Sequence, residues 1–112
     1  MEVQKYLPLT ETSFFIILSL ATAPKHGYAI MKEVEAMSEK RVVLATGTLY
    51  SALRRMLDDD WIEPVVGKDS GAGNRVRKRY QLTRHGRRVL EAETSRLRKL
   101  VDLACLHDIS PG

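Results

Sequence analysis

Hydrophobic residues fall at helical spacing in three successive stretches of the first half of the chain. The first stretch, residues 11–22, is apolar on nearly every side and follows Thr10, a residue suited to the N-cap position. Leu9 and Phe14 have the spacing of a hydrophobic staple across that start. A helix that is apolar all round is buried on several sides. Residues 11–22 are therefore predicted to form the central helix of the core.

Two amphipathic helices are predicted next. After a turn at residues 26–27, residues 28–38 carry apolar side chains at helical spacing. An extended linker over residues 41–45 leads to a third helix, for which Thr46 is the predicted N-cap and residue 59 the approximate end. The apolar stripe of this third helix consists of Leu49, Ala52, Leu53, Met56 and Leu57.

The pattern then changes from helical spacing to short strands. Residues 61–66 are apolar and β-prone, and Pro64 suits them to the edge of a sheet. Residues 67–74, GKDSGAGN, are turn-formers, and residues 77–82 alternate between polar and apolar. Together these segments predict a β-hairpin with a long, basic tip.

One long helix is predicted from its N-cap at Thr83 to about Leu106. Its apolar positions recur in alternating steps of four and three, which is the spacing of a coiled-coil seam. We therefore predict a homodimer whose interface includes Leu90, Leu97, Leu100, Val101 and Ala104.

The order of these elements predicts a winged helix-turn-helix. The fold class is mainly α, of the α+β kind: three helices, a two-stranded β wing, then a long C-terminal helix. Residues 1–82 are predicted to form the winged unit, and residues 83–112 the C-terminal dimerisation helix and tail.

Composition adds limits on assembly and location. A 112-residue domain buries only ~60–70% of its unfolded surface, so pairing with a second copy is an expected source of further burial. The single cysteine, Cys105, excludes an internal disulfide and suits a reducing cytoplasm. The most apolar run, residues 14–18, is far too short for a membrane span, and a signal-peptide pattern is absent. A cytoplasmic protein with no membrane partner is predicted.

Charge is distributed unevenly around a net value of +4. Residues 1–67 contain seven basic and nine acidic residues, whereas residues 68–112 contain eleven basic and five acidic residues. An asymmetry of this kind indicates an anionic partner, either nucleic acid or an anionic membrane surface. The alternative is an ordinary solvated basic face.

The third predicted helix carries hydroxyls, a tyrosine and two arginines opposite its apolar stripe. A recognition helix needs this division, because its stripe packs on the scaffold while its exposed residues reach base edges in the major groove. Any surface helix has a polar face, so the helix alone leaves both interpretations open. The basic hairpin decides between them, since Lys68, Arg75, Arg77 and Lys78 have no structural use on a loop but suit DNA phosphates. Double-stranded DNA is the predicted partner, and residues 1–82 the predicted DNA-binding domain.

The pattern does not predict an enzyme. His26, His85 and His107 are scattered over turns and helix ends, without a Ser-His-Asp or Cys-His grouping. Cys105 and His107 are too few for a zinc site, which needs three or four protein ligands. No cofactor, metal or catalytic residue is expected. Cys105 itself suits either a small apolar position near the dimer seam or a redox role.

Three segments resemble the PadR family of bacterial transcriptional regulators: HGYAI at 26–30, TGTLYSALRRMLDDDWIE at 46–63 and RKRYQLTRHGRRVL at 77–90. The resemblance implies a homodimeric repressor of the small subgroup, with a single C-terminal helix, bound to a palindromic operator. Half-site centres about 10 base pairs apart follow from that geometry. The resemblance implies DNA contacts by Tyr28, Thr48, Tyr50, Ser51 and Arg54, and by the arginines of the wing. Together with the other polar residues of the third helix and the wing, the predicted DNA-contacting set is Tyr28, Thr46, Thr48, Tyr50, Ser51, Arg54, Arg55, Lys68, Asn74, Arg75, Arg77 and Lys78.

The sequence also departs from the family's pattern. Where the family often has a proline at the start of the recognition helix, this chain has residues 45–47, Ala-Thr-Gly. Some small members bind flat drugs between tryptophans of the dimer helix, but here the single tryptophan, Trp61, precedes the wing. A small-molecule effector therefore stays unassigned. The alternative function is a winged-helix protein-interaction module, or a ligand sensor with weak DNA affinity.

Overall fold

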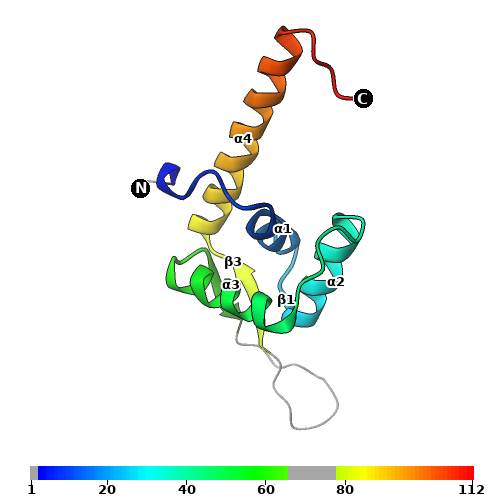
Figure 1. The fold of residues 1–112 in the computed structure, drawn as a ribbon. Helices are drawn as coiled ribbons and strands as arrows, with labels where there is room; N and C mark the ends of the chain where they lie inside the picture. Colours follow the sequence, from blue (N-terminus) through cyan, green and yellow to red (C-terminus); the bar gives the residue numbers. More distant parts are fainter. Residues whose placement is uncertain (1–2, 66–77) are drawn as a thin grey trace.

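The computed structural model describes residues 3–65 and 78–112 (Figure 1). Four helices surround a small sheet, and the last helix projects away from the rest, so that the molecule measures 58 × 34 × 23 Å. In chain order the elements are η1 (Gln4–Tyr6), α1 (Glu11–Ser19), β1 (Lys25–His26), α2 (Gly27–Met37), α3 (Thr46–Asp58), β2 (Ile62–Val65), β3 (Arg79–Leu82) and α4 (Arg84–Leu106).

Helix α1 is the central core helix that the sequence predicts. The Thr10 side chain caps it by accepting a hydrogen bond from the Ser13 amide, at 3.1 Å. The helix ends at Ser19, not at residue 22. The reason is that the Leu20 and Ala21 amides bond to carbonyls three residues back, and the Lys25 ammonium group binds the Ser19 carbonyl at 2.5 Å.

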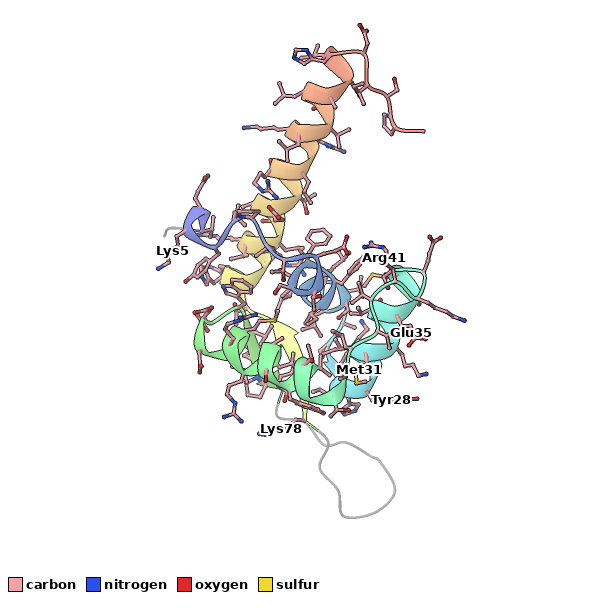
Figure 2. The ribbon with its side chains drawn as sticks, in the orientation of Figure 1. Lys5, Tyr28, Met31, Glu35, Arg41 and Lys78 are labelled. Atoms are coloured by element: carbon pink, nitrogen blue, oxygen red, sulfur yellow. The ribbon has the colours of Figure 1, made fainter. Side chains whose placement is uncertain are left out.

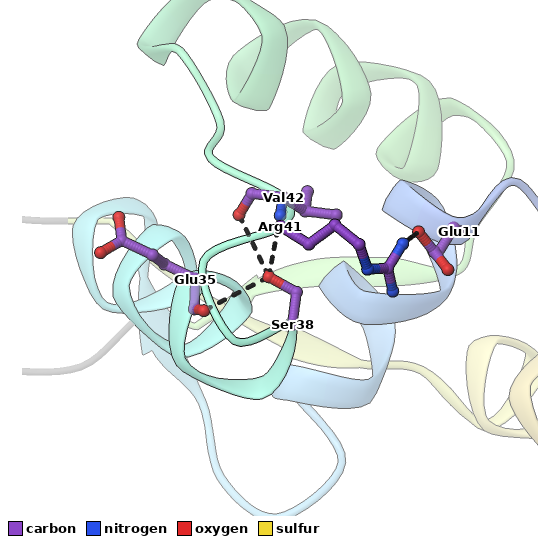
Figure 3. Close-up of polar contacts among 5 residues, drawn as sticks. All are labelled: Glu11, Glu35, Ser38, Arg41 and Val42. Carbon is purple, nitrogen blue, oxygen red and sulfur yellow. Dashed lines mark hydrogen bonds and ion pairs between the residues drawn. The ribbon is translucent and has the colours of Figure 1, made fainter.

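Helices α2 and α3 form the helix-turn-helix. Between them, the Ser38 hydroxyl accepts a hydrogen bond from the Val42 amide at 2.9 Å, which fixes the turn (Figure 3). The predicted N-cap of α3 was wrong: Ala45 has the extended backbone of the N-cap, and Thr46 is already the first helical residue. Because alanine has no hydrogen-bonding side chain, nothing in the described residues caps this helix start.

The sheet has three antiparallel strands in the order β1-β3-β2, so the prediction of two strands was incomplete. Strand β3 is central, with Tyr80 paired to Lys25 on one side and to Pro64 on the other. Pro64 lies on an edge strand, where its missing N–H costs no ladder bond. Strand β1 is two residues long, too short to produce the alternation by which a strand is recognised.

Helix α4 begins inside the core and ends outside it. The Thr83 hydroxyl caps it by accepting a hydrogen bond from the Gly86 amide at 2.9 Å, as the sequence predicts. Gly86 lies against the Trp61 backbone, where an added Cβ would be 1.9 Å from the carbonyl oxygen. Val89 and Leu90 are buried in the core, whereas the apolar side chains after Leu97 are exposed. In the described part of the chain, no helix has the length and hydrophobicity needed to cross a membrane.

The segment before α1 is fastened to α4 by a buried carboxylate. Glu93 is 2% exposed and accepts hydrogen bonds from the Leu9 amide at 3.0 Å and from Arg96 Nε at 2.5 Å. Tyr6 packs edge-on against Trp61, with ring centroids 5.2 Å apart, and against His85 at 5.8 Å. The base of α4 is thereby held by residues from both ends of the chain.

Candidate nucleic-acid interface

Helix α3 divides into a buried stripe and an exposed polar face. Leu49, Leu53 and Met56 are almost completely buried in the core. The opposite face is exposed and consists of Thr46, Gly47, Thr48, Tyr50, Ser51, Arg54 and Arg55. This face suits a major groove, since arginine and hydroxyl side chains can bind both base edges and phosphates.

One flank of this face continues into a pocket at the start of α2. The pocket has a volume of about 600 Å³ and is lined by His26, Gly27, Tyr28, Tyr50, Lys78 and Tyr80. Tyr28 is 67% exposed, and the Lys32 ammonium group lies 5.6 Å from its ring centroid. Tyr28 and Lys78 lie at the same end of the molecule, opposite the free end of α4 (Figure 2).

Gly27 brings Tyr50 close to the start of α2. A Cβ on residue 27 would lie 2.6 Å from the Tyr50 hydroxyl, so any other residue would displace that side chain. At the floor of the pocket, burial raises the pKa of Tyr80, and the neighbouring Tyr50 adds to the rise. Tyr80 therefore keeps its hydroxyl proton at neutral pH and adds no negative charge to the pocket.

The other flank of α3 faces the start of α1. A second open pocket, of about 780 Å³, lies between the two helix starts. It is lined by Thr10, Thr12, Ser13, Ala45, Gly47, Thr48, Ser51, Ala52 and Arg55. Hydroxyl groups from both helices therefore gather beside one arginine.

The sequence profile of the transcriptional regulator PadR-like family matches residues 16–92, which is more than half of the chain. The chain belongs to the PadR-like family. The family is one of transcriptional regulators.

Solved structures of PadR-like proteins have the same fold. A PadR family transcription regulator from hypervirulent Clostridium difficile R20291 is 26% identical and superposes with a TM-score of 0.71, over 88% of this chain and 98% of that one. Bacillus subtilis PadR in complex with operator DNA is 20% identical, with a TM-score of 0.63 over 76% of this chain and 47% of that one. At that identity the second likeness shows the fold alone.

A curated relative is longer than this chain. It is an uncharacterized 37.1 kDa protein in transposon TN4556 of Streptomyces fradiae, 31% identical over 90 residues. The match covers 80% of this chain and 24% of the relative, so the PadR-like chain spans about a quarter of that protein's length.

The structure brings most of the predicted DNA-contacting residues of this PadR-like chain together. Those on α3 share its exposed face, and Tyr28 and Lys78 line the pocket beside Tyr50. Lys68, Asn74, Arg75 and Arg77 lie outside the described residues. The sequence predicts only a turn at Gly27 and a capped helix start at Thr10, and no DNA contact at either place. The signal for Gly27 is its place directly before Tyr28 in the HGYAI segment.

The predicted dimer residues on α4 fall into two groups. Leu97, Leu100 and Val101 are exposed on the projecting part of the helix, and Ala104 is partly exposed. Leu90, in contrast, is 6% exposed and packs in the chain's own core. Its predicted place in the interface is corrected, because it has almost no surface left for a partner.

Proposed function

We propose that this PadR-like regulator is a repressor that binds a palindromic operator as a homodimer and acts on DNA in the cytoplasm. In this proposal α3 enters the major groove and reads base edges through Arg54 and Ser51. Beside α3, the side chains of Tyr28, Tyr50 and Lys78 contact the sugar-phosphate backbone of the DNA. The observation that carries the proposal is the exposed face of α3, whose arginine and hydroxyl side chains continue into the pocket at the start of α2.

Dimerisation through α4 forms the second part of the proposal. Leu97, Leu100, Val101 and Leu103 are exposed on the projecting part of α4, and Leu106 is 79% exposed at its end. A two-fold contact between copies of this face would remove these side chains from water. It would also place two α3 helices on one side of the dimer, as successive half-sites require.

An effector that releases the operator completes the proposal. The pocket between Tyr28, Tyr50 and Lys78 is open and belongs to the proposed DNA contact. A small molecule seated there would compete directly with DNA.

The experiment is to mix the purified protein with fragmented genomic DNA and sequence the fragments that it retains at moderate salt. The expected result is a few palindromic sites with half-site centres about 10 base pairs apart. The matched variants are Arg54→Ala and Lys78→Ala. Arg54→Ala should lose about 1–3 kcal/mol of specific binding, whereas Lys78→Ala should weaken all sequences alike.

Uniform or absent enrichment would contradict the repressor assignment. It would favour a winged-helix module that binds another protein, or a ligand sensor with weak DNA affinity.

A further inference from the structure

The pocket between the starts of α1 and α3 has the donors of an anion site. The Thr10 side chain already occupies the Ser13 amide, but the amides of Glu11 and Thr12 have no acceptor in the described residues. At the start of α3, Ala45 offers no side-chain cap. The first amides of α3 are therefore also left without an acceptor in the described part of the chain. Two helix N-termini, each with a positive dipole end, thus border one pocket.

A serine hydroxyl that makes no hydrogen bond within the described residues also lines this pocket. Ser13 is only 7% exposed, lines the pocket, and its hydroxyl has no hydrogen-bond partner among the described residues. Two other buried serines of the chain are satisfied: Ser19 donates to the Ile16 carbonyl at 2.6 Å, and Ser38 bonds to the Val42 backbone. The Ser13 hydroxyl is therefore available to bond to a group that enters the pocket.

Gly47 indicates that something approaches this surface closely. It lies in the first turn of α3 with helical backbone, so no left-handed conformation requires a glycine. An added Cβ would meet no described atom within 4 Å, so no crowding inside the chain requires it either. Glycine weakens a helix relative to alanine, and a close approach by a ligand is the remaining reason for one.

The charge at the pocket suits an anion. Arg55 is exposed on its rim, without an ion-pair partner among the described residues. The acid in the first turn of α1, Glu11, is neutralised by an ion pair with Arg41 (Figure 3). That contact also lowers the pKa of Glu11 through its hydrogen bond to Arg41. Arg55 belongs to the last turn of α3, but its side chain lines the same pocket as the two helix starts and several hydroxyls. Arginine, hydroxyls and helix N-termini are the groups that bind phosphate.

We infer that this pocket binds one backbone phosphate of the operator, on the strand that borders the major groove beside α1. The inference rests on the proposed function. Along the exposed face of α3, Tyr50 and Arg55 lie on opposite flanks, with Arg54 and Ser51 between them. A helix in the major groove is bordered by both backbones. In this arrangement the pocket at Tyr50 faces one strand of the DNA duplex. The pocket lined by Arg55, Ser13 and Gly47 faces the other DNA strand.

The first test measures affinity by fluorescence anisotropy for a duplex retained in the genomic selection, or for any duplex bound in a salt-dependent manner. Gly47→Ala and Ser13→Ala should each weaken binding. The Gly47→Ala loss should be about tenfold, because the added methyl group would keep the phosphate out of hydrogen-bonding distance of the first amides of α3. The thermal unfolding midpoint of Gly47→Ala should be unchanged or higher. Arg55→Ala should reduce the salt dependence by about one unit. Arg98→Ala, an exposed arginine on α4, is the matched control and should bind like the unaltered protein.

The second test replaces the phosphates of the duplex one at a time by uncharged methylphosphonate. For the unaltered protein, one position on the α1 side should weaken binding. For Gly47→Ala and Arg55→Ala, the same replacement should cause no further loss, because the contact is already gone. If every replacement costs the variants as much as the unaltered protein, the phosphate site is wrong.

A third arm distinguishes DNA phosphate from free anions. Inorganic phosphate is titrated against chloride at constant ionic strength while the Gly47 and Thr12 amide resonances are followed by NMR, and the duplex is then added. The expected result is that the duplex shifts both resonances and displaces any bound phosphate. Saturation by phosphate, together with unchanged DNA binding in the variants, would make this a free-anion site and overturn the inference. If the unaltered protein bound no duplex at all, the proposed function itself would fall.

Discussion

The buried carboxylate of Glu93 accepts a hydrogen bond from the backbone amide of Leu9, 84 residues earlier in the chain, at 3.0 Å. Arg96 binds the same carboxylate through Nε at 2.5 Å and Nη2 at 2.9 Å. The Glu93 carboxylate therefore ties the segment before α1 to α4. Its negative charge is neutralised by Arg96, on the same helix. Both the stability of the fold and the direction of α4 depend on this contact.

Replacement of Glu93 by alanine should lower the free energy of unfolding by about 1–3 kcal/mol, because the Leu9 amide and Arg96 both lose their acceptor. Urea unfolding followed by circular dichroism measures the change. Glu91→Ala, an exposed acid on the same helix, is the control and should stay within about 0.5 kcal/mol of the unaltered protein. Equal effects of the two substitutions would show that the Leu9 contact contributes nothing.

The same carboxylate should make stability depend on pH in the acid range. The hydrogen bond from Arg96 lowers the pKa of Glu93 below its ordinary 4.5, and the Leu9 amide adds to this, against an opposing effect of burial. A lowered pKa gives stability that is complete above the unfolded-state value and is lost as the pH falls through the folded-state value. Unfolding free energy should therefore fall below pH 4.5 more steeply in the unaltered protein than in Glu93→Gln. Parallel curves for the two proteins would contradict this.

Gly86→Ala should destabilise the fold by about 3 kcal/mol, because the new Cβ cannot avoid the Trp61 carbonyl oxygen at 1.9 Å. The obstacle is backbone and not the end of a flexible side chain. Gly47→Ala is the matched control, since its Cβ meets open space, and it should raise the free energy of unfolding by about 0.5–1 kcal/mol. Both are measured by thermal unfolding, and a tolerated Gly86→Ala would mean that α4 can shift on Trp61.

Gly27→Ala should impair DNA binding far more than stability. The Cβ would lie 2.6 Å from the Tyr50 hydroxyl, which is the movable end of a side chain, so Tyr50 swings away from its position beside α3. In a Tyr50→Phe background the hydroxyl is gone, and Gly27→Ala should then cost less affinity. A double-mutant cycle by fluorescence anisotropy measures this coupling. If the losses of binding free energy from the two substitutions simply add, Gly27 does not act through the position of Tyr50.

Leu97→Glu combined with Val101→Glu should give a monomer in sedimentation velocity, because both exposed residues lie on the projecting part of α4. The monomer should keep its helical circular dichroism, since neither side chain belongs to the core. Arg98→Glu combined with Asp102→Lys, on the same turns, is the control and should leave the assembly state unchanged. A dimer that survived the first pair would place the interface elsewhere.

Elements with a repeated hydrophobic pattern could be predicted from the sequence, as could two of the three helix N-caps, whereas Thr46 is not the cap of α3. Elements defined by a single tertiary contact could not be predicted. Thr10 and Thr83 cap their helices as predicted because a cap is a local hydrogen bond. Strand β1 has two residues and no alternation, and its only evidence is pairing with β3. Leu90 lies in register with the exposed residues of α4, but spacing cannot distinguish the chain's own core from a partner.

The candidate site shows the same division. The polar face of α3 follows from its sequence, since the residues opposite an amphipathic stripe are exposed whatever the stripe packs on. The pocket beside Ser13 could not be predicted, because it exists only where α1 and α3 start side by side in space. In the sequence, residues 10–13 indicate only a capped helix start.

Helix α4 runs without interruption from the buried Glu93 to the exposed Leu106. That span is about 20 Å long at the usual rise per residue, so a tilt of about 5° at its root displaces the far end by about 2 Å. In the proposed two-fold dimer the displacement would act on both copies, and the distance between the two α3 helices would change with it. The residues ahead of α1, which contact the buried start of α4, would then influence how well the proposed dimer matches the helical repeat of DNA.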